Sequence, residues 1–274
     1  MTDPDTFGVA SEPLSGEPGP GPRIFLAGTV SSVLDLSWEL LAKDPRFGEF
    51  SSLVAESQTA GRGRRGRTWA SPPGHLYAAL LLPEKPPFEG QLASVSVSLF
   101  LVLALEEILG PKPMIKWPND LMLDGWKFGG VLLENRGGKV MAGIGMNLNR
   151  SPETERHPRA PETGALPAGD LSPLDLWKRL ASNVFSRYND EFGKKGSSPR
   201  DSSPHRGERV ASMTGARLHG MGKTWEVLDP RCDPPAEGNP LRGVLRGIDP
   251  RGNLLLETDG LVRRVWSGTL LTLP

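Results

Sequence analysis

The distribution of apolar residues along the chain predicts a mixture of strands and helices. Residues 76–82 (LYAALLL) are apolar throughout, which is typical of a strand buried on both faces of a sheet. Residues 92–109 form a longer apolar run, and its serines together with Glu106 and Glu107 favour a core helix over a membrane span. Residues 174–192 carry apolar side chains at helical spacing, which predicts a second long helix.

Shorter segments surround these elements. We expect a helix over residues 34–42, because its apolar positions share one helical face. The short strands expected in the first 150 residues are 24–26, 52–56, 114–117, 128–134 and 140–147. Beyond residue 209 short strand-like segments separated by turn residues dominate, and they predict a small all-β barrel. These segments are 216–218, 224–228, 242–248, 254–257 and 261–266.

Polar segments rich in Gly, Pro and Ser mark the expected domain boundaries. We expect residues 1–22 to form a disordered tail and residues 23–193 to form a domain of mixed helices and strands. Residues 194–209 are expected to be a linker, and residues 210–274 the barrel. The role of the Pro-rich segment 229–240 inside the barrel stays open at this point.

The composition narrows the functional classes. The 274 residues contain 32 Lys and Arg against 32 Asp and Glu, and a zero net charge argues against a broad nucleic-acid-binding face. The one cysteine, Cys232, can form no internal disulfide, which fits a reducing cytoplasm. The N-terminal segment lacks the apolar stretch that forms the core of a signal peptide. We therefore expect a cytoplasmic protein. The four histidines show no metal-ligand spacing and are expected at the surface or in loops.

The most unusual segment is residues 58–69 (QTAGRGRRGRTW). Guanidinium groups this close repel one another unless an anion joins them, and arginine binds phosphate or carboxylate through paired hydrogen bonds. Interleaved glycines let the backbone approach a ligand closely. The segment predicts a site for a small phosphate-bearing ligand. A solvated Arg/Gly loop and an RNA-binding tract are the alternatives.

A second group of motifs follows about fifty residues later. Residues 116–120 are KWPND, and residues 127–134 are KFGGVLLE. In the second motif one residue separates the lysine from a pair of glycines. A lysine beside closely packed backbone can place its ammonium group against a ligand, although a lone lysine is usually a surface residue. Residues 143–147 (GIGMN) complete the ordered set.

This ordered set resembles the motifs of the biotin protein ligases, also called biotin–[acetyl-CoA-carboxylase] ligases. The resemblance covers residues 24–272 and includes residues 243–252 (GVLRGIDPRG) and Ser267-Gly268. It implies an α+β fold, with a mixed-sheet catalytic domain backed by helices (biotin/lipoate ligase-like) and a small C-terminal SH3-like β-barrel. Because only 22 residues precede the first expected strand, we expect the single-function form that lacks an N-terminal DNA-binding domain.

The resemblance also implies a two-step activity that uses ATP and Mg²⁺, with biotin as substrate. The biotin carboxylate attacks the α-phosphate of ATP and gives biotinyl-5′-AMP and pyrophosphate. A lysine of a biotin carboxyl carrier protein, a domain of acetyl-CoA carboxylase or a similar enzyme, then takes the biotinyl group. No DNA or membrane partner is expected, and a homodimer is one oligomeric state that the family allows.

Residue roles follow from the same resemblance. Lys127 and Arg62 would be catalytic, and Asp120 would hold Mg²⁺ or, alternatively, shape a turn. The biotin-binding residues implied are Ser32, Gln58, Gly61, Arg62, Arg64, Lys127, Gly143 and Gly145. The ATP-binding residues implied are Arg64, Arg65, Arg67, Trp69, Lys116, Asn119 and Lys127. We expect the loop over residues 61–69 to be mobile until a ligand orders it, because its adjacent arginines lack partners.

One departure from the family pattern lies before the first helix. Where the family has Ser-Thr-Asn, this chain has Ser32, Val33 and Leu34, and replacing Thr by Val removes a hydrogen bond that is worth roughly 1 kcal/mol or more. This departure leaves open a related lipoate-type acyl-adenylate ligase with another acid specificity. A non-catalytic biotin- or nucleotide-binding protein is a third hypothesis.

Overall fold

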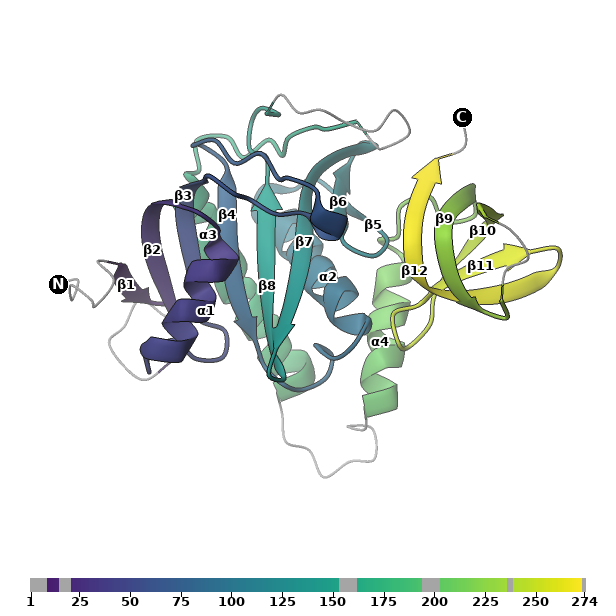
Figure 1. Cartoon of the computed structure of the whole chain (residues 1–274), viewed down its shortest axis with the longest axis horizontal. Helices are drawn as coiled ribbons and strands as arrows, with labels where there is room; N and C mark the ends of the chain where they lie inside the picture. Colours follow the sequence, from purple (N-terminus) through teal and green to yellow (C-terminus); the bar gives the residue numbers. More distant parts are fainter. Residues whose placement is uncertain (1–8, 15–20, 153–161, 194–202, 236–238, 273–274) are drawn as a thin grey trace.

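The structure is a computed structural model that describes residues 9–14, 21–152, 162–193, 203–235 and 239–272. One eight-stranded sheet carries helices on both faces and stands beside a four-stranded barrel (Figure 1). The sheet order is β1-β2-β3-β4-β8-β7-β6-β5. Neighbouring strands are antiparallel except β2 and β3, which are parallel. The strands are β1 (Ala10–Pro13), β2 (Arg23–Val30), β3 (Ser52–Gln58), β4 (Leu76–Leu82), β5 (Met114–Lys116), β6 (Asp120–Leu123), β7 (Trp126–Arg136) and β8 (Lys139–Met146).

Helices cover the two faces of the sheet unequally. Helix α1 (Val33–Lys43) packs on β3, β4 and β8 from one side. Helices α2 (Leu92–Leu109) and α3 (Pro173–Tyr188) cover the other side. Every residue of β4 is buried, as its sequence predicts for a strand covered on both faces. Helix α2 is long and apolar enough to cross a membrane, but 67% of it is buried inside this domain, so it is a core helix.

The C-terminal strands close into a barrel of order β10-β11-β12-β9. These strands are β9 (Thr224–Asp233), β10 (Leu241–Ile248), β11 (Leu254–Thr258) and β12 (Leu261–Thr272). Helix α4 (Ser203–Gly215) precedes the barrel and packs on both α2 and β10. The predicted fold class, an α+β catalytic domain with a small barrel behind it, is confirmed.

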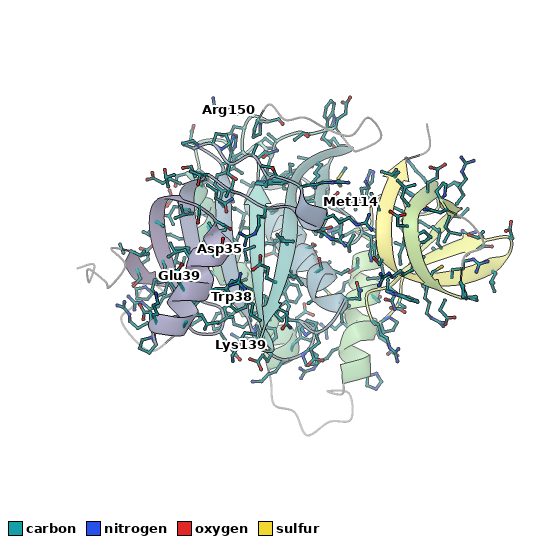
Figure 2. All side chains as sticks on the ribbon, in the orientation of Figure 1. Asp35, Trp38, Glu39, Met114, Lys139 and Arg150 are labelled. Atoms are coloured by element: carbon teal, nitrogen blue, oxygen red, sulfur yellow. The ribbon has the colours of Figure 1, made fainter. Side chains whose placement is uncertain are left out.

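Specific contacts fix the barrel against the sheet domain, and side chains fill the junction between them (Figure 2). The indole Nε1 of Trp117 donates a hydrogen bond to the carbonyl of Gly252 at 2.9 Å. A Cβ on Gly252 would lie 2.8 Å from the Cα of Leu92, so only glycine allows this approach. Residue Leu218 bridges Ile115 of β5 in parallel register. The barrel therefore has a defined position beside β5. Its strand β12 faces the sheet domain.

Two boundaries differ from the sequence-based organisation. Residues 10–13 lie in the segment expected to be a tail, yet they form β1 and pair with β2; the Arg23 side chain donates to the hydroxyl of Ser11 at 3.2 Å. Residues 203–209 lie in the expected linker, yet they belong to α4. In the expected tail, residues 9, 14, 21 and 22 are described and belong to no strand. Residues 1–8 and 15–20 of the tail and residues 194–202 of the expected linker lie outside the described residues.

The prediction that the histidines lie at the surface or in loops agrees with His75, which stands in the loop directly before β4, although this loop residue is buried. Its side chain is buried with 2% exposure, and its Nδ1 accepts a hydrogen bond from the backbone N–H of Leu148 at 3.1 Å. Burial, followed by the nearby Arg150, lowers the pKa of His75 below its ordinary value. The neutral imidazole therefore acts as a structural acceptor.

Replacing Trp117 by Phe tests the junction between the barrel and the sheet. The change removes the donor and leaves the carbonyl of Gly252 without its partner, which costs about 1–3 kcal/mol of unfolding free energy. Urea denaturation of both proteins measures this loss. The matched control is Trp266→Phe in β12, where the tryptophan is 37% exposed. An equal, small effect for both variants would contradict the proposed importance of the junction.

Candidate active site

A cavity of about 510 Å³ lies between the sheet domain and the barrel. Its wall comes from the start of α1, the Arg/Gly loop, the β5–β6 turn, β7, β8 and, from the barrel, β9 and β12. The structure brings nearly all of the predicted site residues to this one wall. They are Ser32, Gln58, Arg62, Arg64, Arg65, Arg67, Trp69, Lys116, Asn119, Asp120, Lys127, Gly143 and Gly145.

Gly61 is the one predicted residue outside the cavity wall, and it shapes the loop instead. A Cβ at this position would lie 2.4 Å from the carbonyl oxygen of Trp69 and 2.5 Å from the Ser71 hydroxyl. The Gly61 carbonyl accepts a hydrogen bond from the Trp69 N–H at 2.9 Å. Because only glycine fits here, Gly61 lets residues 61–69, which we call the Arg loop, fold back on themselves.

The Arg loop is a short hairpin with an ordered tip. Arg62 and Thr68 form an antiparallel bridge, and residues 64–66 form a single 3₁₀ turn. Arg65 and Gly66 both adopt left-handed backbone conformations, with φ values of 57° and 72°. Arginine rarely adopts such a φ, so contacts of its side chain must hold this turn in place.

The prediction that the arginines of the Arg loop lack partners is wrong for three of them. The Arg62 guanidinium donates to both carboxylate oxygens of Asp35, at 2.6 and 2.9 Å, and to Glu134 at 2.9 Å. Arg64 Nη1 donates to Asn119 Oδ1 at 3.0 Å, and Arg65 Nη1 donates to Thr269 Oγ1 of the barrel at 2.6 Å.

Lys127 occupies the centre of the site. Its Nζ lies 2.6 Å from Asp120 Oδ1 and 5.5 Å from the centroid of the Trp69 ring. The tight packing of β7 on β8 sets this position, because a Cβ on Gly129 would lie 2.8 Å from the carbonyl oxygen of Gly145. The first of the two glycines after Lys127, Gly129, therefore has a structural reason.

Lys116 lies deeper in the cavity wall, with 4% exposure. The pKa of Lys116 is lowered to about 8, chiefly by burial; the nearby Asp120 opposes this shift, and the positive charges of Lys127 and Arg67 add to it. Its Nζ lies 5.7 Å from the ring centroid of Trp225 in the barrel. Near neutral pH this buried ammonium group is charged and available to an anion.

The end of the cavity at α1 is mainly apolar. Leu34 packs against Gly143, where an added Cβ would lie 2.9 Å from Leu34 Cδ1. Gln58 is fixed at both ends of its amide: Oε1 accepts from the Val33 N–H and Nε2 donates to the Ser71 hydroxyl, each at 2.9 Å. Ser32 is buried and precedes the helix without capping it. This end can hold a compact apolar acid.

The charge of the wall is strongly one-sided. Among the described residues it carries six cationic side chains and a single carboxylate, Asp120. The cationic residues are Arg62, Arg64, Arg65, Arg67, Lys116 and Lys127. Such a wall, next to an apolar pocket, suits a ligand that joins an organic acid to phosphate groups.

Asp120 is the residue that fits a Mg²⁺ ion. No group of three or more His, Cys, Asp or Glu side chains that could hold a metal occurs within the described ranges of the chain. Magnesium bound to a nucleotide usually takes one or two carboxylates and fills its other positions with phosphate oxygens and waters. A single carboxylate beside a cationic wall fits that arrangement and does not fit an ion held by protein ligands alone.

Several residues of the site were not found from the sequence. Asp35, which pairs with Arg62, carries no motif of its own. Glu134 ends the motif at residues 127–134 and Thr269 follows Ser267-Gly268, but the sequence assigned no partner to either residue. The contact of Leu34 with Gly143 joins residues more than one hundred positions apart. The sequence also did not indicate that the Trp69 indole packs on Gly145.

A mixed sheet that carries an Arg loop over a cationic cavity, followed by a small barrel, defines the class of biotin and lipoate ligases. Residues 49–150 match the family model described as "Biotin/lipoate A/B protein ligase family". The chain is 32% identical over 207 residues to the biotin–[acetyl-CoA-carboxylase] ligase of Paracoccus denitrificans, covering 67% of this chain and 83% of that protein. It is also 32% identical to the bifunctional ligase/repressor BirA of Bacillus subtilis, covering 96% of this chain and 76% of that protein.

The fold agrees with these relatives. The biotin protein ligase of Aquifex aeolicus, solved in complex with biotin and ATP, superposes with a TM-score of 0.67 at 25% identity. The match covers 90% of this chain and 97% of that one. The chain therefore belongs to the biotin protein ligase family.

Titration of Lys116 gives a pH-dependent prediction. Its lowered pKa of about 8 means that the ammonium charge is present below that pH and is lost as the pH rises through it. We expect ATP affinity to fall above about pH 8, by up to about tenfold per pH unit, because a bound anion favours the protonated amine. Calorimetry between about pH 7 and pH 9.5 measures this. Lys116→Arg keeps the charge and should remove the decline; identical profiles for both proteins would contradict the assignment.

Gly145→Ala tests the contact with Trp69. The new Cβ would lie 2.6 Å from the indole Nε1, so the ring and the Arg loop attached to it must move away from β8. We expect biotin and ATP affinities to fall about tenfold or more, since the ring forms part of the cavity wall. Gly28→Ala in β2 is the matched control, because nothing lies within 4 Å of its added Cβ. Equal affinities for the two variants would rule out this role of Gly145.

Proposed function

We propose that this protein is a cytoplasmic, ATP-dependent ligase that activates biotin as biotinyl-5′-AMP and transfers the biotinyl group to a lysine of a biotin carboxyl carrier protein. One observation carries the proposal: a single cavity joins an apolar end at Leu34 and Gly143 to a cationic end, with Lys127 in its wall. The names of the relatives and the biotin and ATP bound in the Aquifex aeolicus protein support the same conclusion.

The first step joins the acid to the nucleotide. A carboxylate oxygen of biotin forms a bond to the α-phosphorus, and the bond from that phosphorus to the pyrophosphate oxygen breaks. Negative charge develops on the phosphoryl oxygens and on the leaving group. The Nζ of Lys127 and the guanidinium groups of Arg64 and Arg67 supply fixed positive charge for these oxygens.

Asp120 and Trp69 give Lys127 a defined position for this step. The carboxylate of Asp120 at 2.6 Å and the ring of Trp69 hold the ammonium group, so little reorganisation is needed when charge develops. Mg²⁺, when bound with the nucleotide beside Asp120, supplies additional charge neutralisation for the phosphates.

The second step moves the biotinyl group to the carrier. The lysine amine of the carrier attacks the acyl carbon, the bond from that carbon to the phosphate oxygen breaks, and AMP leaves. The attacking nitrogen releases one proton to the solvent as the amide forms. Negative charge appears on the acyl oxygen and on AMP, so Lys127 stabilises this step as well.

A biotinylation assay tests the proposal. The purified protein is incubated with ATP, Mg²⁺, biotin and the carrier domain of an acetyl-CoA carboxylase, and the carrier mass is measured. The expected result is one added biotinyl group together with equal amounts of AMP and pyrophosphate. A folded protein that leaves the carrier unmodified with biotin would overturn the proposal.

A lipoate-type ligase is the second candidate, and the apolar side chains of Val33 and Leu34 at the acid end of the cavity favour it. The two candidates differ in the acid that the same assay accepts. Lipoate or octanoate transfer, with biotin inactive, would support the second candidate.

Lys127→Met tests the role of the central ammonium group. The change keeps a similar side-chain length and removes the charge, so we expect the rate of adenylate formation to fall by about 10²–10³. Single-turnover release of pyrophosphate measures this rate. The control is Lys139→Met. This exposed lysine stands at the start of β8 and forms an ion pair with Glu84. A similar small loss in both variants would show that Lys127 does not act on the reacting atoms.

A further inference from the structure

We propose that Trp225 of the barrel is a positioning residue for the nucleotide end of the cavity. The face of its ring holds the ammonium group of Lys116 where an anionic group of the nucleotide binds. The identity of that ligand, ATP, rests on the proposed function. The sequence assigned no role to Trp225, and the barrel that carries it becomes a working part of the site.

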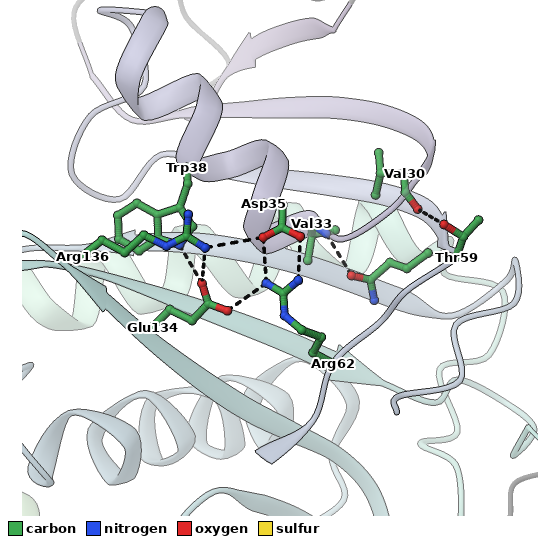
Figure 3. A network of polar contacts seen from close by, with 9 residues as sticks. Val30, Val33, Asp35, Trp38, Thr59, Arg62, Glu134 and Arg136 are labelled. Atoms are coloured by element: carbon green, nitrogen blue, oxygen red, sulfur yellow. Dashed lines mark hydrogen bonds and ion pairs between the residues drawn. The ribbon is translucent and has the colours of Figure 1, made fainter. Parts of the chain in front are cut away.

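Lys116 differs from two other cations of the cavity wall in having no acidic partner. Arg62 pairs with two carboxylates of the sheet domain (Figure 3), and Lys127 pairs with Asp120 at 2.6 Å. The ammonium group of Lys116 makes no hydrogen bond or ion pair with any other residue in the described part of the chain. Lys116 is 4% exposed and lines the cavity. Its three donors therefore suit an anionic ligand, and its buried charge needs a stabilising neighbour.

The face of the Trp225 ring is that neighbour. The Nζ of Lys116 lies 5.7 Å from the ring centroid, which is within the range where the negative face of an indole attracts a cation. The attraction grows when water is excluded, and Trp225 is 2% exposed. The ring therefore stabilises the charge of the ammonium group and favours one position for it.

The ring of Trp225 is itself held by its surroundings. Its Nε1 donates a hydrogen bond to the carbonyl of Gly220 at 3.1 Å, and the His219 ring packs against it edge-on, with the ring centroids 5.9 Å apart. A Cβ on Gly220 would lie 2.3 Å from the indole Cζ2, so the backbone at this glycine packs directly on the ring. None of these contacts involves Lys116, and the ring can therefore serve as a fixed support for the ammonium group.

The segment that leads into the barrel also fixes the backbone next to Lys116. Ile115, the preceding residue of β5, donates from its N–H to the carbonyl of Arg217 at 2.7 Å and accepts from the His219 N–H at 2.8 Å. Residues 217–219 therefore pair with β5 at its end, and Trp225 follows a few residues later in β9. The backbone and the ammonium group of Lys116 are thus both held from the C-terminal part of the chain, which reduces the cost of ordering this side chain when a ligand binds.

The experiment compares Trp225→Phe with Trp225→Leu. Both variants lose the hydrogen bond to Gly220, but only Phe keeps a ring face for Lys116. Calorimetry measures the dissociation constant of ATP without biotin, so that no adenylate forms, and the dissociation constant of biotin separately. Trp266→Leu is the matched control, because it removes an exposed tryptophan from β12. Melting temperatures show that each variant is folded, and Trp225→Ile replaces Trp225→Leu if the latter does not fold.

Trp225→Leu is expected to bind ATP about fivefold more weakly than Trp225→Phe, because only the Phe variant keeps an aromatic face against the ammonium group. Biotin affinity should be the same in both variants, since biotin occupies the apolar end of the cavity. Trp266→Leu should change neither constant. In the background of Lys116→Met, which lacks the ammonium group, Trp225→Phe and Trp225→Leu should bind ATP equally, because a double-mutant cycle isolates the contact between the two side chains.

Equal ATP affinities of Trp225→Phe and Trp225→Leu would overturn the positioning role of Trp225 and leave the proposed function intact. A difference between these two variants that persists in the Lys116→Met background would also overturn it, because the ring would then act through the packing of the barrel and not through the ammonium group. If the unmodified protein binds no ATP, the proposed function and the positioning role fail together.

Discussion

Among the described residues, six cationic side chains share the wall of one cavity with a single carboxylate, and the surrounding structure has to accommodate their mutual repulsion. Two like charges about 4 Å apart repel by about 4 kcal/mol at an effective dielectric constant of about 20. Three local devices reduce this energy. Asp35 and Glu134 neutralise Arg62, Asp120 neutralises Lys127, and the lowered pKa of Lys116 makes its proton easier to lose. The positive charge that remains favours an anionic ligand.

The fold keeps these charges close together by placing each on a strand or on a loop that a strand leads into. Lys127 stands at the start of β7, Lys116 at the end of β5, and the Arg loop begins after β3. Close backbone contacts at Gly61 and Gly129 set the approach of these elements, since a Cβ at either position would overlap a carbonyl oxygen. The barrel completes the wall through β12. The apolar core on both faces of the sheet therefore positions the charged residues. It also restricts the movements that would carry the charges apart.

The sequence predicted the parts of this arrangement that local pattern records. The apolar run of β4 and the long apolar helix α2 were recognised from their composition, and the ordered motifs gave the family and the cavity residues. The sequence did not indicate β1, because four residues between polar, Pro-rich segments carry no clear period. It also gave no sign of the partners of Arg62. Asp35 lies 27 positions away and Glu134 lies 72 positions away, so only the packing of α1 and β7 brings them to the loop.

We propose that the apolar and cationic ends of one cavity join biotin to the α-phosphate of ATP. Exchange of labelled pyrophosphate into ATP, measured with and without biotin and with no carrier present, tests this step directly because it needs the first half-reaction alone. We predict rapid exchange that depends on biotin and stops when biotin is withheld. A folded protein that shows no exchange with biotin, or equal exchange without it, would contradict this mechanism.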